Sequence, residues 1–230
     1  MLGWAPQVMP TAGDDLAARV MDLYTHRDPL LASALRLGLD TDKIAARQGM
    51  GVDKPKGGGD PAAMRQAAAG AARLMAADDG PRIAAMAFDG WDTHAQEGGP
   101  VGRLAALLGG LDGAIEALEQ GLGARWRDTA VVVVTEFGRT AKINGTVGTD
   151  HGTGTIALLA GGAIKGGRVI ADWPGLKPAQ LYEGRDLRPT TDLRAVLKGV
   201  LAGQFGLSQA VLGQSVFPDS ASVAPISIIA

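Results

Sequence analysis

The amino-acid sequence predicts an α/β fold with a mostly parallel sheet and helices packed against it. Three observations predict this class: apolar runs typical of buried strands at residues 82–88, 130–135 and 155–160, an amphipathic helix pattern between the first two runs, and glycine-rich loops after the strands. Elements in this order favour a right-handed βαβ unit. The chain has 230 residues, 46% of them apolar, which is sufficient for one such core.

The first third of the chain is rich in alanine and predicts helices without strands. The expected helices cover residues 14–24, 29–48 and 61–77. Residues 51–60, between the last two, contain two lysines and three consecutive glycines, a composition typical of a surface loop. We therefore predict a helical region over residues 1–80.

The α/β core is predicted over residues 81–214. Its first strand is followed by a helix whose apolar residues recur every three or four positions, so that one stripe can pack against the sheet. The stripe comprises Val101, Leu104, Leu108, Leu111, Ile115, Leu118 and Leu122. Four consecutive valines within residues 130–135 predict a central parallel strand that is covered on both faces.

A last amphipathic helix ends the predicted core, with Thr190 or Thr191 as its N-cap. One face of this helix carries the apolar residues Leu193, Val196, Leu197, Val200 and Leu201. The tail, residues 215–230, has no clear periodicity. The length favours one domain overall.

Composition excludes several classes of site and partner. The chain has no cysteine, so a metal ion must be bound by histidine and carboxylate. The net charge is −2 without a block of like charges, and no nucleic-acid partner is expected. No apolar stretch reaches about 18 residues and the first residues do not resemble an export signal, so we expect no transmembrane segment and no signal peptide in this chain.

Polar clusters occur where the predicted strands end. They cover residues 89–94 (Asp-Gly-Trp-Asp-Thr-His), 135–139 (Thr-Glu-Phe-Gly-Arg) and 149–152 (Thr-Asp-His-Gly). In open α/β sheets ligands bind outside the carboxyl ends of the strands, so clusters at successive strand ends can meet in space. The sequence therefore predicts one site that is built from all three clusters.

The residue types in these clusters indicate a metal site. Imidazole nitrogen and carboxylate oxygen are ligands of zinc and manganese, and a catalytic site needs about three protein ligands and an open position. His94, His151 and one of Asp89 or Asp92 would supply such a set, with Asp150 as a further candidate ligand. Each histidine alone is more typical of a loop residue, and the metal hypothesis depends on their occurring together with carboxylates.

Two further residues are catalytic candidates. Glu136 could bind a second ion, since two neighbouring metal ions commonly bind the attacking and leaving oxygens in phosphoryl transfer. Arg139 could bind an anionic substrate oxygen bidentately. The alternative is that Glu136 and Arg139 form only a local ion pair. Residues 138–154 are rich in glycine but lack the spacing of a nucleotide-binding loop, so these glycines more plausibly let the backbone pass close to the metal site.

Several ordered motifs resemble a bacterial family known as domain of unknown function 1501. They lie at residues 88–94, 135–140, 148–152, 166–168 and 172–176, followed by Asp-Leu at 186–187 and Thr-Thr-Asp at 190–192. This family in turn resembles the alkaline phosphatase and sulfatase superfamily. The resemblance implies a three-layer, mostly parallel sheet with flanking helices, an alkaline-phosphatase-like core that is incomplete at its amino terminus in this chain.

The superfamily resemblance also implies roles for individual residues. Asp89 or Asp92 with His94 would match its aspartate-then-histidine metal pair, Glu136 its strand-end aspartate, and His151 its later histidine ligand. Phe137 departs from the pattern, because the superfamily has a second histidine there. No serine or threonine is assigned as the nucleophile.

The expected function is a metal-dependent hydrolase of phosphate or sulfate esters, or the carboxy-terminal part of one. The resemblance implies a divalent metal, zinc or manganese, a small anionic ester as substrate, and a periplasmic or exported location. An exposed sheet edge would favour a homo-oligomer. The alternative is a catalytically inactive, exported binding or assembly protein with the same fold.

Overall fold

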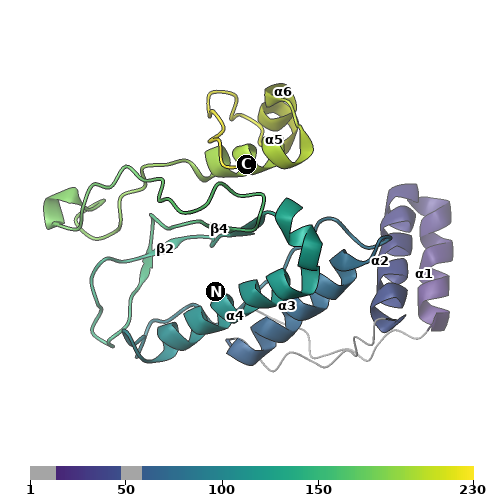
Figure 1. The fold of residues 1–230 in the computed structure, drawn as a ribbon, viewed down its shortest axis with the longest axis horizontal. Helices are drawn as coiled ribbons and strands as arrows, with labels where there is room; N and C mark the ends of the chain where they lie inside the picture. The colour runs from purple at the N-terminus through teal and green to yellow at the C-terminus, as the bar shows by residue number, and fades with distance from the viewer. Residues whose placement is uncertain (1–13, 48–58) are drawn as a thin grey trace. The chain divides into compact units, whose positions relative to one another are not determined.

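The computed structural model describes residues 14–47 and 59–230 (Figure 1). The chain divides into two compact units, residues 1–53 and 54–230. In the first unit, helices α1 (Asp14–Arg27) and α2 (Pro29–Arg47) confirm the two expected helices. Asp28 separates them, because its carboxylate accepts hydrogen bonds from the N–H groups of Leu30 and Leu31, both at 3.1 Å. The surface loop expected at residues 51–60 lies outside the described residues except for its last two positions.

The second unit begins with helix α3 (Pro61–Ala76), which packs against helix α4 (Arg103–Leu122). The two helices run in the same direction and approach closely through small residues. A Cβ atom at Gly110 would lie 2.7 Å from the Cα of Pro61, and one at Gly121 would lie 2.6 Å from the Cβ of Ala72. The glycines of α4 therefore give α3 the room it needs.

The hydrophobic core of this unit lies between α3 and α4. Its buried residues are Met64, Ala68, Ala72, Leu107, Ala114, Ala117, Leu118 and Leu122. Of the expected stripe, Leu111, Leu118 and Leu122 are buried, whereas Val101 and Leu108 are exposed and Leu107 is buried instead. The face of α4 that packs on α3 therefore includes Leu107, Ala114 and Ala117, which the predicted stripe did not contain.

The strands pair antiparallel, so the expected parallel arrangement is wrong for them. Strand β1 (Val131–Val133) pairs with β4 (Leu158–Ala160), and β2 (Gly138–Arg139) pairs with β3 (His151–Gly152). Parallel neighbours need a crossover connection of a dozen or more residues, usually a helix. The segment between β1 and β4 instead turns back on itself as the β2–β3 hairpin, and the chain therefore returns antiparallel.

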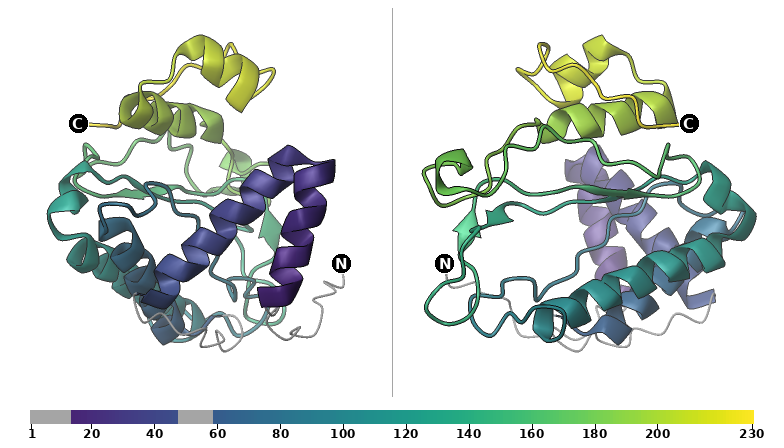
Figure 2. Two further views of the ribbon diagram at one scale, coloured as in Figure 1. Left: turned by 90° about the vertical axis from the view of Figure 1, so that its right-hand side faces the viewer. Right: turned by 60° about the vertical axis from the view of Figure 1, so that its left-hand side comes forward.

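Residues 82–88, expected as the first strand, form no hydrogen-bonded ladder in the described structure. The described residues are helix-rich with small antiparallel sheets, and they do not show a three-layer parallel sheet. The strands of the second unit lie between the α3–α4 pair on one side and helix α5 (Leu193–Phe205) on the other (Figures 1 and 2).

Helix α5 begins at a cap different from the one expected. The carboxylate of Asp192, rather than Thr190 or Thr191, accepts a hydrogen bond from the N–H of Arg194 at 2.8 Å. The helix ends at Gly206, whose φ of 65° is the left-handed conformation that glycine adopts at low cost.

The carboxy-terminal tail packs on α5. Lys198 is fully buried, and its ammonium donates hydrogen bonds to the carbonyls of Ser220 at 2.5 Å and Val223 at 3.0 Å. The segment after α5 contains helix α6 (Gln209–Val211) and a π-helical turn (Leu212–Val216).

The remaining short helices are 3-10 helices at Gly123–Asp128 and Pro178–Gln180. None of the helices in the described ranges has the length and apolarity needed to cross a membrane.

Candidate metal centre

The candidate centre forms where the loop between β2 and β3 packs against residues 92–97. The N–H groups of Gln96 and Glu97 donate to the carbonyls of Thr146 and Val147, both at 3.0 Å. Gly148 makes this approach possible, because a Cβ atom there would lie 2.3 Å from the carbonyl carbon of His94. The loop glycines thus bring the backbone close to the site, as the sequence suggested.

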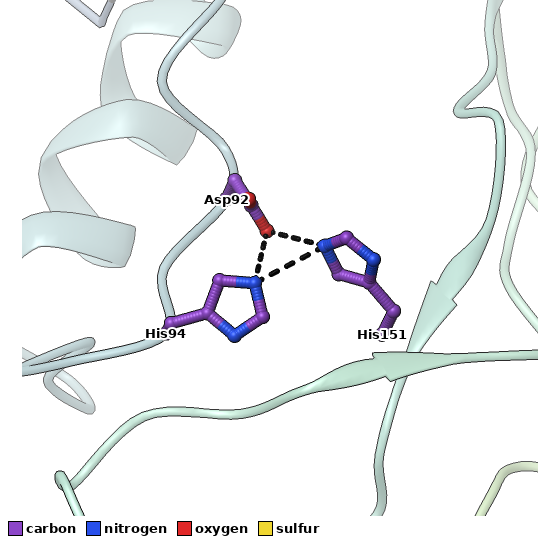
Figure 3. Close-up of side chains that lie close together, drawn as sticks. All are labelled: Asp92, His94 and His151. Atoms are coloured by element: carbon purple, nitrogen blue, oxygen red, sulfur yellow. Dashed lines mark hydrogen bonds and ion pairs between the residues drawn. The ribbon is translucent and has the colours of Figure 1, made fainter. Parts of the chain in front are cut away.

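Asp92, His94 and His151 converge at this contact (Figure 3). Asp92 Oδ1 lies 3.0 Å from His94 Nε2 and 2.8 Å from His151 Nε2, and the two Nε2 atoms are 3.1 Å apart. The three side chains are about half exposed, at 58%, 45% and 51% respectively. A small molecule could therefore reach the cluster from solvent.

The spacing of the three atoms fits a single metal ion. Ligand atoms at about 2.0–2.1 Å from a tetrahedral zinc ion lie roughly 3.3 Å from one another. The three observed separations are only slightly shorter than this, so small rotations of the side chains would complete the geometry. Two imidazoles and one carboxylate also form a known catalytic zinc ligand set with an open fourth position.

His94 is oriented for coordination by a second layer of residues. Its Nδ1 lies 3.2 Å from the carboxylate of Asp150, which also accepts a hydrogen bond from the amide of Asn144 at 2.9 Å. The tautomer of His94 that donates its Nδ1 proton to Asp150 has the lone pair of Nε2 available for a metal ion. The backbone is fixed as well, since Asn144 and Thr146 both donate hydrogen bonds to the carbonyl of His94, at 2.9 and 2.6 Å.

His151 is held differently. Its ring packs on Phe137, with centroids 4.2 Å apart and planes inclined at 35°. Phe137 therefore packs against the side of this candidate ligand. The two histidine rings are 4.8 Å apart.

The electrostatics of the centre favour an ionised carboxylate. Desolvation alone would raise the pKa of Asp92, but hydrogen bonds from Arg139 and His151 and the charges of the two histidines outweigh it and lower the pKa. The amide of Asn144, followed by His94, likewise lowers the pKa of Asp150. Ionised carboxylates are the form that binds a cation or orients a metal-bound histidine.

The model of the family described as "Protein of unknown function (DUF1501)" matches residues 10–216 of the chain. The chain belongs to this family. No curated protein and no solved structure matches the chain.

In this DUF1501 protein the predicted site residues divide into two groups. Asp92, His94 and His151 form the metal-competent cluster within the described ranges, and Asp150 contacts the far nitrogen of His94 instead of joining them. Asp89 and Glu136 are exposed and lie outside the cluster. The local ion pair between Glu136 and Arg139, the alternative to their catalytic roles, is absent from the described contacts, and Arg139 contacts Asp92 instead.

The sequence assigned no role to the residues that support the DUF1501 cluster, although Thr149 belongs to one of the three polar motifs. The supporting residues are Asn144, Thr146 and Thr149 in the loop and Glu97 opposite it. An Asn-Gly pair at residues 144–145 is a turn signal that could have indicated an amide fixed inside the loop. No signal in the sequence indicated that its amide would bind both the backbone and the carboxylate beside His94.

Proposed function

We propose that this chain is a metal-dependent hydrolase of phosphate or sulfate esters, or the carboxy-terminal part of one. The observation that supports it most is the convergence of Asp92, His94 and His151, whose ligand atoms lie within 4.8 Å of one another. Two of these residues come from one segment and the third lies 57 positions after His94. Such a long-range meeting of metal-binding groups favours a site over a chance surface cluster.

The three residues would hold a divalent ion, zinc or manganese. When bound, such an ion supplies a Lewis acid and an activated water. The role of the protein is to fix the ligands: Asp150 orients His94, Phe137 supports His151, and the partial exposure of all three leaves room for a small anionic ester.

The ordered motifs support an alkaline-phosphatase-like ancestry, of which this chain carries the carboxy-terminal portion. They also support a periplasmic or exported location. We further propose that the protein associates into a homo-oligomer. Exposed large apolar side chains favour self-association, among them Ile83, Val134, Ile156 and Val169.

A second candidate function is a catalytically inactive binding or assembly protein with the same fold. The engagement of Arg139 favours it, because this cation contacts Asp92 rather than presenting a free guanidinium to a substrate. Glu136 also stands outside the cluster, which leaves one metal position instead of two among the residues that the structure describes.

Metal analysis followed by an activity assay distinguishes the hydrolase from the inactive binding or assembly protein. The chain is freed of metal with chelator, dialysed against zinc or manganese, and analysed for bound metal beside the variants His94→Ala and His151→Ala. The hydrolase proposal expects about one equivalent in the wild type, loss in both variants, and metal-dependent cleavage of p-nitrophenyl phosphate or sulfate. Stoichiometric metal without cleavage argues against the hydrolase. A wild type that binds neither metal contradicts the metal site and favours the binding or assembly protein.

A further inference from the structure

The guanidinium of Arg139 is hydrogen-bonded to other residues of the protein through all three of its nitrogens. Its NH1 donates to Asp92 Oδ1 at 2.5 Å, its Nε donates to the hydroxyl of Thr149 at 3.0 Å, and its NH2 donates to the carbonyl of Thr149. Its side chain is only 23% exposed. Every nitrogen of the guanidinium therefore already has a partner in the protein.

A second carboxylate fixes the direction of these hydrogen bonds. The hydroxyl of Thr149 donates to Glu97 Oε2 at 2.7 Å. Because a hydroxyl has a single proton, its oxygen is left to accept from Arg139. Glu97 is itself tied to the loop through its backbone N–H. The four side chains form one chain of hydrogen bonds from Glu97 through Thr149 and Arg139 to Asp92.

We propose that Arg139 is a positioning residue that presents Asp92 Oδ1 to the metal site, an inference that rests on the proposed metal-dependent function. Two of its nitrogens are fixed on Thr149, so the third can reach Asp92 in one orientation only. The oxygen that it contacts is the same Oδ1 that lies beside both histidine nitrogens. Arg139 thus selects the rotamer in which this half-exposed carboxylate faces His94 and His151.

The planar fork of the guanidinium is essential to this role. Lysine would keep the positive charge, but a single ammonium cannot bond to Asp92 and to both atoms of Thr149 in a fixed geometry. A role based on charge alone predicts that lysine restores the site. A positioning role predicts that it does not.

The test measures metal affinity and ligand geometry instead of turnover. Zinc is titrated into wild type, Arg139→Gln, Arg139→Lys and the control Arg127→Gln, in competition with a chromophoric chelator, and cobalt(II) absorption reports the coordination geometry. Arg127 is a suitable control because its exposed guanidinium pairs only with the adjacent Asp128 among the described contacts. Loss of a residue that orients a metal ligand typically weakens affinity about 10- to 100-fold.

We expect that loss in Arg139→Gln and Arg139→Lys alike, with an altered cobalt spectrum, and wild-type affinity in Arg127→Gln. Unchanged or tighter zinc binding in Arg139→Gln, or full recovery in Arg139→Lys, overturns the positioning role and leaves the metal site intact. A wild type that binds neither zinc nor manganese overturns the proposed function together with this inference. If Arg139→Gln fails to fold, Thr149→Val serves instead, because it removes the hydroxyl between Glu97 and Arg139; wild-type affinity in that variant refutes the proposal.

Discussion

Replacing Gly148 with alanine tests whether the packing of the β2–β3 loop creates the site. A Cβ atom at this buried glycine would lie 2.3 Å from the carbonyl carbon of His94, 2.4 Å from its oxygen and 2.5 Å from the carbonyl oxygen of Thr93. Favourable contacts begin near 3.5 Å, so the loop must move away by roughly 1 Å. All three neighbours are backbone atoms that cannot rotate out of the way.

This displacement carries an energetic and a functional consequence. Overpacking of this kind typically costs about 1–3 kcal/mol, which urea unfolding monitored by circular dichroism measures directly. The same shift moves His94 relative to His151, so zinc affinity should fall by at least tenfold in the chelator competition. Both effects should appear in one variant, because one contact supports the fold and the site.

Gly145→Ala provides the matched control from the same loop. A Cβ atom at Gly145 meets nothing within 4 Å, and its φ is not in the left-handed region. We expect wild-type stability and zinc affinity in this variant. If Gly148→Ala and Gly145→Ala behave alike, the close approach of the loop does not determine the site and the reasoning is wrong.

Three further changes test the surroundings of the site and the carboxy-terminal part. Asp150→Asn removes the negative charge beside His94 Nδ1 and should weaken zinc binding by about 10-fold or more in the same titration. Asp192→Ala removes the cap of α5 and should cost about 1 kcal/mol of unfolding free energy in urea. The hydrogen bond from Arg194 lowers the pKa of Asp192. The stabilisation is therefore present above the ordinary carboxyl pKa of about 3.9 and is lost as the pH falls through the lowered pKa. The free energies of unfolding of wild type and variant should converge in acid. Lys198→Met leaves the partly buried carbonyl of Val223 without the ammonium and the carbonyl of Ser220 with only the N–H of Val223 as donor, so it should cost about 1–3 kcal/mol in thermal or urea unfolding. An unchanged midpoint would show that water replaces the ammonium.

The residues of the cluster could be named from the sequence because their chemistry is local. Asp92 and His94 are two positions apart, and His151 lies in a short polar motif after a glycine-rich stretch. Few histidines and no cysteines restrict the possible ligand sets, so the pairing of His94 with His151 could be inferred without knowing the fold. The choice between Asp89 and Asp92 could not, because it depends on which carboxylate the backbone turns toward the histidines.

The direction in which the strands pair was predicted incorrectly, and the reason is physical. Four consecutive valines indicate a strand with apolar surroundings, but they do not encode the direction of its partner. That direction depends on the connection, and residues 134–157 contain no helix to carry the chain across the sheet. Apolar periodicity therefore identified β1 and β4 but could not determine that they pair antiparallel.

The contacts around the site imply that the loop and the ligands form one cooperative unit. The amides of Gln96 and Glu97 donate to loop carbonyls, and the amide of Thr149 donates in the opposite direction to Thr93 at 3.3 Å. Opening of these hydrogen bonds must separate His94 from His151, since each histidine belongs to one side of the contact. A bound metal ion would oppose that opening through both ligands.

Hydrogen exchange can detect this coupling. At a zinc concentration about 100 times its Kd, bound metal adds about 2.7 kcal/mol to any opening that releases it, so exchange at Gln96, Glu97 and Thr149 should slow about 100-fold. The amide of Ile226, which donates to Ala195 in the α5–tail contact, should be unaffected by local openings at the site. Equal slowing at Ile226 would indicate that metal stabilises the second unit as a whole, and no slowing at Glu97 would mean that the loop opens without breaking the site.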